Sequence, residues 1–164
     1  MRTIVLAFCF ACGVVTANAA DSYTIDPTHT FPRFAINHFG FSTHHGQFNK
    51  TTGKLVLDRA AKTGSIEITV QTASVGTGDP KLEDHLRSPD FFHVEKFPVM
   101  TFKANSLKFA GDVPVLAEGE LTMLGVTRPL ALTIAHVRCA PHPFVKKEDC
   151  GAEVSGKLKR SRSE

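Results

Sequence analysis

The 164-residue sequence has no tryptophan, one tyrosine and no strong excess of either charge. Thirteen phenylalanines supply nearly all of its aromatic side chains, which fits an apolar interior. The formal net charge of +3 is too small to argue for nucleic acid, and no stripe of lysine and arginine is interleaved with aromatics. We therefore expect no nucleic-acid partner. The charge is compatible with an anionic small ligand or with transient contact with a membrane surface, and it indicates neither.

Apolar runs long enough to span a membrane are also missing. The longest, TIVLAFCFACGVV at residues 3–15, follows a positive residue and precedes the small-x-small pattern Ala17-Asn18-Ala19. These features are typical of a cleaved secretory signal peptide, here residues 1–20. We expect a periplasmic protein without a transmembrane segment. The remaining residues, 21–164, are enough for one domain with a sizeable core.

Few cysteines remain after that cleavage, because only Cys139 and Cys150 lie outside the signal segment. An even pair in an oxidising compartment is most simply a disulfide. A bridge around so short a loop stabilises by about 3 kcal/mol on the chain-entropy model. The weaker alternative is a metal site in which His136 and His142 join the two thiols.

Sequence motifs of catalysis are absent as well. His44 and His45 are the most obvious pair of metal ligands, yet neighbouring residues on a strand point to opposite faces, and no HExxH-like spacing occurs. No serine lies in a nucleophile elbow, and no glycine-rich phosphate loop follows a strand. We expect a protein that is not an enzyme and has no metal. A metal-dependent enzyme is the less favoured alternative, which loss of activity on chelation would reveal.

Alternating apolar residues are the main positive signal in the chain. Residues 31–39, 64–72 and 126–137 alternate with period two, the mark of a half-buried strand. Further strand candidates are SYTI, KLVLD, MTFKANSLKF, VLAEGELTML and AEVSGKLK. The glycine-containing stretches HHGQ, KTGS and FAGDVP are expected to be turns between strands.

One helix is expected, at DPKLEDHLRS. Asp79 suits its N-cap and Pro80 its first turn, while Pro89 ends it. Many antiparallel strands and a single helix predict an all-β protein with a closed or nearly closed β-barrel. A barrel of about eight strands is just wide enough to hold one small ligand. A β-sandwich with a solid core would show the same alternation.

Several motifs, in one order along the chain, resemble the YceI-like family of bacterial polyisoprenoid-binding proteins. They are YTIDPTHTFPRFAINHFGFST, TGDPKLEDHLRS, DHLRSPDFFHVEKFPVMTF, GELTMLGVTRPLALTI and GAEVSGKLKRS, and they span residues 22–161. The resemblance implies a lipocalin-like antiparallel barrel with a helix beside it. It also implies an apolar tunnel for a linear lipid, either a polyisoprenoid or an isoprenoid quinone, with no catalytic activity. Family members are often dimeric, so a homodimer is expected.

Two positions depart from the family pattern. His93 stands where the motif usually has an aspartate after the phenylalanine pair, so no role of that acid carries over. The chain ends in LKRSRSE, where the family usually continues with Asp-Phe-Gly and two further strands. We therefore expect a barrel that lacks its closing strands and exposes unpaired edges.

Nine apolar residues on the predicted strands are expected to line the tunnel, with a solid core as the alternative for each. They are Phe34, Ile36, Ile66, Ile68, Val70, Phe102, Leu130, Leu132 and Ile134. Three further phenylalanines, Phe91, Phe92 and Phe97, are expected to seat the helix against the barrel.

Selection among lipids is expected to depend on the lipid head group. Burial stabilises by about 0.8 kcal/mol per methylene, but a membrane offers a lipid tail nearly the same gain. His38 shares a strand face with Phe34 and is expected to point inward, as a head-group contact or as a satisfied core residue. Weaker candidates are Arg33, His85 and Arg87. A guanidinium group suits phosphate, but most arginine side chains are solvated on the surface.

A second reading of the sequence is a ligand-free protein that works in the stress response or through its outer surface. A solvent extract of the purified protein that contains no lipid would favour it. His29, in the stretch DPTH, is expected either to contact a head group or to cap a turn.

Overall fold

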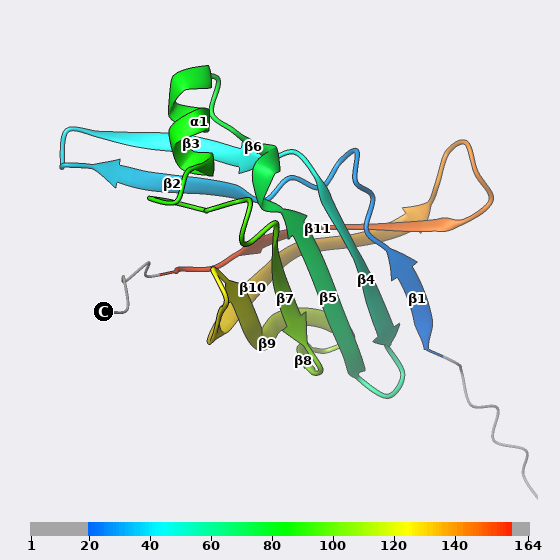
Figure 1. Cartoon of the computed structure of the whole chain (residues 1–164). Coiled ribbons are helices and arrows are strands. Elements are labelled where there is room, and N and C mark those ends of the chain that lie inside the picture. The colour runs from blue at the N-terminus through cyan, green and yellow to red at the C-terminus, as the bar shows by residue number, and fades with distance from the viewer. Residues whose placement is uncertain (1–19, 159–164) are drawn as a thin grey trace, which may run out of the picture.

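The computed structural model describes residues 20–158, so the expected signal peptide up to residue 19 and the last six residues lie outside it (Figure 1). Within this part, no helix has the length and apolar character needed to cross a bilayer. The elements, in chain order, are β1 Asp21–Thr24, β2 Arg33–His38, β3 Ser42–Phe48, β4 Thr51–Asp58, β5 Thr63–Gln71, the 3-10 helix Thr72–Ser74, β6 Val75–Gly76, α1 Pro80–Arg87, β7 Val99–Ala104, β8 Leu107–Ala110, β9 Val113–Met123, β10 Val126–Pro141 and β11 Glu148–Ser155.

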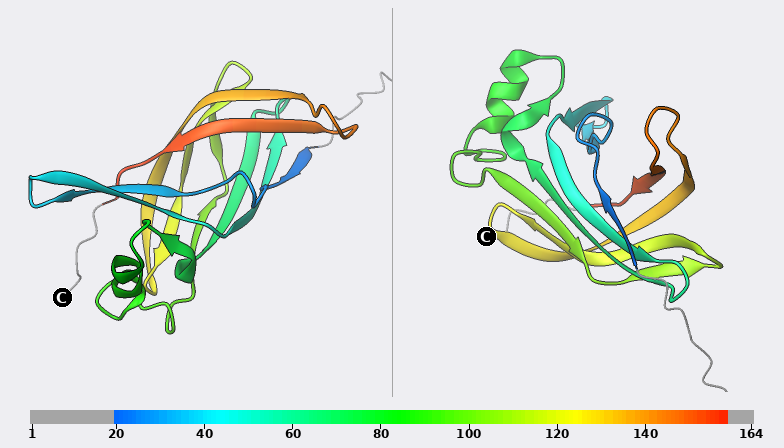
Figure 2. Two further views of the ribbon diagram at one scale, coloured as in Figure 1. Left: turned by 90° about the horizontal axis from the view of Figure 1, so that it is seen from above. Right: turned by 90° about the vertical axis from the view of Figure 1, so that its right-hand side faces the viewer.

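Eight of the strands form one strongly curled antiparallel sheet (Figures 1 and 2). Their order is β1-β4-β5-β7-β9-β10-β11, and β8 pairs with β9 beside this path. The prediction of a lipocalin-like, mostly β fold with one helix is confirmed, in the form of a half-barrel. The sheet is not a closed ring, because β1 and β11 do not pair with each other in residues 20–158.

The register of the strands places apolar side chains together on one face of the sheet. Tyr23 lies opposite Leu55, which lies opposite Ile66, and Ile68 lies opposite Phe102. Side chains from β1 to β10 contact one another in a single cluster, which only the concave side of a curled sheet permits. We call this concave side the inner face. From the cluster it contains Tyr23, Leu55, Leu57, Ile66, Ile68, Phe102, Ala104, Leu107, Phe109, Ala117, Leu121, Leu130, Leu132 and Ile134. The strand register places Val70 and Arg128 on the same side.

The opposite face of the sheet is polar, as period-two alternation requires. Glu67 and Lys103 lie opposite each other there, with 2.7 Å between the Glu67 Oε1 and Lys103 Nζ atoms. Lys108 and Glu118 form a similar ion pair at 2.8 Å. The alternation in the sequence therefore separates a wet convex face from an apolar concave one.

A second, three-stranded sheet consists of β2, β3 and β6, and its β2–β3 hairpin reaches out from the body (Figure 1). The expected turn at HHGQ is wrong, because these residues lie inside β3. The hairpin turns instead at Gly40, whose N–H donates to Asn37 Oδ1 at 2.7 Å. Gly46 is needed for packing, since a Cβ there would lie 2.2 Å from the Phe34 ring.

The helix forms where the sequence predicts it. The Asp79 carboxylate accepts from the N–H groups of Lys81 and Leu82, at 3.0 and 3.4 Å, and Pro80 is the first helical residue. These contacts satisfy two of the N–H groups that a helix N-terminus leaves without partners. The helix ends at Arg87, two residues before Pro89.

Candidate functional site

The inner face of the curled sheet is only partly buried. Phe102 is 5% exposed, but Ile66, Leu130 and Ile134 keep intermediate exposure. All of the side chains in this cluster come from the curled sheet itself. A close-packed core would bury these residues fully. The inner face therefore retains apolar surface that an apolar ligand could cover.

One end of the half-barrel is closed by the helix and the segment that follows it. Leu86 of α1 packs with Phe48, Val70 and Val75, and all four are 6% exposed or less. Phe91, Phe92 and other partly buried residues complete this cluster. We call this the capped end of the half-barrel. Val70 locates it at the C-terminal end of β5.

Of the three phenylalanines expected to seat the helix, Phe91 and Phe92 do so and Phe97 does not. The ring of Phe92 meets that of Phe48 with 5.2 Å between centroids, and Phe91 packs in the same cluster. Phe97 instead lies beside the turn between β9 and β10, where a Cβ on Gly125 would come within 2.9 Å of its ring.

At the other end, three polar residues join the two edge strands of the sheet. Arg59, in the β4–β5 turn, places Nη2 3.0 Å from the Tyr23 hydroxyl and 2.9 Å from Glu148 Oε1. The Tyr23 hydroxyl donates to the same Glu148 oxygen at 2.8 Å. We call Tyr23, Arg59 and Glu148 the edge bridge, since it links β1 to β11 through side chains.

The electrostatics of the edge bridge follow from these bonds. Hydrogen bonds from Tyr23 and Arg59 lower the pKa of Glu148, because they stabilise its ionised form. Burial raises the pKa of Tyr23, and donation to Glu148 raises it further. The bridge is therefore intact at neutral pH, with Glu148 ionised and Tyr23 protonated.

Cys139 and Cys150 form a disulfide beside the edge bridge. Cys139 and Cys150 are paired across β10 and β11, and Arg59 Nη2 lies 3.1 Å from Cys139 Sγ. Ligand atoms of Cys139, Glu148 and Cys150 lie within 4.8 Å of one another. A metal ion does not suit this group in the disulfide form, because the sulfurs are bonded to each other and a guanidinium lies against them.

Most of the predicted tunnel residues lie together. Seven of the nine are on the inner face: Ile66, Ile68, Val70, Phe102, Leu130, Leu132 and Ile134. Phe34 packs instead into the cluster of the capped end, with its ring 5.8 Å from that of Phe48. Ile36 is on the projecting hairpin, 53% exposed and apart from the other eight.

None of the four head-group candidates lies on the inner face. His38, expected to point inward, is exposed on the hairpin, where its ring stacks on His44 with 4.4 Å between centroids. Arg33 is exposed at the start of the same strand. The reason is that β2 belongs to the second sheet, so its apolar face does not continue the inner face.

The other two candidates are bound within the helical segment. The Arg87 guanidinium donates to the carbonyls of Ala73 and Val75, each at 3.1 Å, and also pairs with Glu83 and Asp84. The His85 ring meets the Phe91 ring edge to face, with 4.8 Å between centroids. His29 lies 2.6 Å from Asp26, whose carboxylate also accepts from the Thr28 hydroxyl and N–H, so this histidine belongs to a turn.

Sequence reasoning missed two polar residues of the inner face. Arg128 lies opposite Leu121 and shares its face, two residues before Leu130 on β10. Tyr23 contributes to the same cluster from β1. Both follow the alternation of their strands, so the period-two pattern could have found them.

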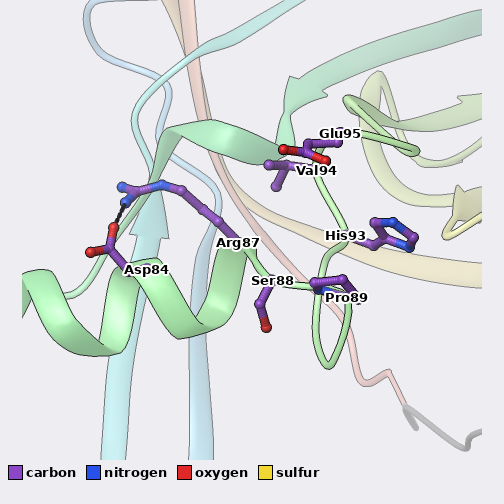
Figure 3. A pocket seen from close by; sticks show the side chains of 7 residues that line it. All are labelled: Asp84, Arg87, Ser88, Pro89, His93, Val94 and Glu95. Carbon is purple, nitrogen blue, oxygen red and sulfur yellow. Dashed lines mark hydrogen bonds and ion pairs between the residues drawn. The ribbon is translucent and has the colours of Figure 1, made fainter.

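An open pocket of about 370 Å³ lies at the C-terminal end of the helix (Figure 3). Its lining consists of Asp84, Arg87, Ser88, Pro89, His93, Val94 and Glu95. Figure 3 shows the Arg87 guanidinium turned to Asp84, so the carboxylate already neutralises it. The pocket is formed by α1 and the segment after it, so it is separate from the inner face.

The fold and the site define a small half-barrel protein with an apolar concave face. The profile of the YceI-like domain matches residues 23–162. The chain belongs to the YceI-like family. It is 34% identical to Protein YceI of Salmonella agona (strain SL483), over 97% of this chain and 85% of that one. A UPF0312 protein of Ectopseudomonas mendocina (strain ymp) is 39% identical, over 78% of this chain and 68% of its own. The matches reach almost the whole chain and give the expected truncation no support.

Solved structures resemble the fold as well. BcnA of Burkholderia cenocepacia has a TM-score of 0.57 at 25% identity, over 68% of this chain and 72% of its own. The YCEI protein of Campylobacter jejuni has a TM-score of 0.55 at 22% identity, over 84% of this chain and 98% of its own. At 22% identity, the likeness to the Campylobacter jejuni protein shows a common fold and nothing more.

Proposed function

We propose that this protein binds and carries a long apolar lipid, a polyisoprenoid or an isoprenoid quinone, without catalysing a reaction. The observation that carries the proposal is the inner face, a continuous apolar surface on which Ile66, Leu130 and Ile134 are only half-buried. Membership of the YceI-like family, generally non-catalytic binding proteins, supports it. We propose further that the carriage takes place in the periplasm, after export.

The lipid tail lies along the inner face in this proposal, with the capped end as its stop. Each buried methylene contributes about 0.8 kcal/mol, and the tail gains a comparable amount in a membrane. Selection must therefore come from the shape of the curled sheet and from polar groups beside it. Tyr23 of the inner face, at the end away from that stop, is better placed to meet a head group than the four residues expected from the sequence.

The test compares two aspartate variants on neighbouring residues of β10. Leu132→Asp puts a charge on the inner face, whereas Ala131→Asp puts the same charge on the exposed outer face. Each protein is purified from the periplasm, and its lipid content is measured by native mass spectrometry and solvent extraction. We expect wild type and Ala131→Asp to retain an isoprenoid lipid and Leu132→Asp to lose it.

Two outcomes contradict the proposal. Equal lipid content in both variants would remove the inner face as the site. An empty wild-type protein that also fails to take up a long-chain isoprenoid quinone from detergent would favour the ligand-free, surface-acting alternative. Thermal melts of both variants show whether Leu132→Asp is still folded, and if it is not, Leu132→Asn provides a milder polar change at the same place.

A further inference from the structure

The loop between β10 and β11, residues 142–147, exposes an unusual set of side chains. Phe144 is 90% exposed and Val145 is 51% exposed. Lys146 and Lys147 follow them directly, and both are exposed. Figure 1 shows this loop, in orange, projecting from the body on the side opposite the β2–β3 hairpin.

The loop is held in one shape by its own backbone and by His142. The Nδ1 atom of His142 accepts from the N–H groups of Phe144 and Val145, at 3.1 and 3.2 Å. The His142 N–H donates to the Lys147 carbonyl at 2.8 Å, and the Cys139–Cys150 disulfide ties the two strands just below. Phe144 and Val145 are thus presented outward on a fixed support, so little ordering entropy is lost on binding.

The charges of the loop favour an anionic partner. The acids that follow it are already engaged, since Glu148 lies 2.9 Å from Arg59 and Asp149 lies 3.5 Å from His142 Nε2. Neither Lys146 nor Lys147 forms an ion pair within residues 20–158. Exposed apolar side chains beside unpaired lysines are what a surface of anionic lipids attracts.

We propose that loop 142–147 docks this protein on an anionic membrane surface. Phe144 and Val145 enter the boundary between head groups and acyl chains, while Lys146 and Lys147 lie on lipid phosphates. The loop directly precedes Glu148 of the edge bridge, and Figures 1 and 2 show it apart from α1. In this proposal, docking brings the edge bridge close to the bilayer. The proposal does not rest on lipid carriage, because it concerns a different surface.

The protein offers an internal control at the tip of the β2–β3 hairpin. Phe39 and Phe41 are 84% and 90% exposed there, as open as Phe144. The stretch NHFGFST at this tip contains no lysine or arginine. An equal change at Phe41 therefore tests aromatic exposure without the adjoining positive charge.

The experiment is co-sedimentation of the lipid-free mature protein with vesicles. One set contains phosphatidylcholine and phosphatidylglycerol in equal parts, and the other contains phosphatidylcholine alone. We expect binding to the anionic set that falls as salt is raised. Lys146→Gln with Lys147→Gln should weaken it about 30-fold, since each lysine near an anionic surface contributes roughly a factor of five. Phe144→Ser should weaken it about tenfold, and Phe41→Ser should leave it unchanged.

Several results would overturn the proposal. Equal binding to both vesicle sets, or equal loss in Phe41→Ser and Phe144→Ser, would remove the role of this loop. If Phe144→Ser instead dissociated a dimer in sedimentation velocity and left vesicle binding intact, the loop would be a surface for a second copy of the chain. Thermal melts ensure that each variant is folded, and Phe144→Leu, which keeps an apolar tip, should restore most of the binding.

Discussion

The two ends of the half-barrel are held together in different ways. At the capped end, Leu86, Val70 and Val75 are 1 to 6% exposed and pack in one apolar cluster. At the other end, Tyr23, Arg59 and Glu148 join the sheet edges through hydrogen bonds. The inner-face residues nearby range from buried, as Leu57 at 3% exposure, to half-buried, as Leu55 and Ile66. Close packing fixes the first end, while directional polar bonds hold the second and leave room beside them. The difference assigns stability to one end and ligand access to the other.

The largest effect should come from deleting side chains at the capped end. Leu86→Ala should destabilise by about 4 kcal/mol, because it leaves a cavity in a closely packed cluster. Ile134→Ala, at a half-buried position of the inner face, should lower the free energy of unfolding by less than about 2 kcal/mol, since solvent or neighbouring side chains fill the space. Urea unfolding followed by circular dichroism measures both. Equal losses would mean that the inner face is packed as tightly as the capped end.

The next effect should come from the disulfide at the other end. Replacing Cys139 and Cys150 with serine should lower the free energy of unfolding by about 3 kcal/mol, the loop-closure value for a short loop. Amide hydrogen exchange should rise in β10 and β11 and stay unchanged in α1, if the two ends are independent. Faster exchange throughout the helix would show instead that the ends are coupled.

The smallest effect should come from the edge bridge, and it should depend on pH. Because its hydrogen bonds lower the pKa of Glu148, the bridge stabilises the fold above the ordinary pKa of a glutamate and is lost as the pH falls through the lowered value. Glu148→Gln should therefore melt below wild type at neutral pH and match it in strong acid. Glu120→Gln, on the outer face, is the control. If the difference in melting temperature between Glu148→Gln and wild type persisted in acid, the charge of Glu148 would not be its cause.

Much of the fold could be predicted, because alternation and capping are local. The pattern of residues 64–72 predicts β5, and Asp79 with Pro80 predicts the start of α1. The same alternation identified seven inner-face residues. The β2–β3 hairpin could not be placed in this way, since period two gives the faces of a strand and not the sheet that it joins. His38 was expected to point inward for that reason.

Two further features depend on contacts that no short stretch of sequence contains. Gly46 was interpreted as part of a turn, whereas it lies in a strand and makes room for the ring of Phe34. The edge bridge unites residues from β1, a turn and β11, so nothing local indicates that Tyr23, Arg59 and Glu148 meet. Only the curl of the whole sheet brings them together.

The distance along the chain between the two ends of that bridge has a consequence for the order of folding. Tyr23 and Glu148 are 125 residues apart, so we expect their bond to form only after the intervening strands of the curled sheet have assembled. Local pairs such as β4 with β5 and β9 with β10 are expected to form first, and the joining of the edges last. β1 and β11 present backbone groups on which another chain can add a strand, and these groups stay unpaired in the folded sheet. The side-chain bridge holds the two edges close to each other. We therefore expect the risk of aggregation to be greatest before the bridge forms.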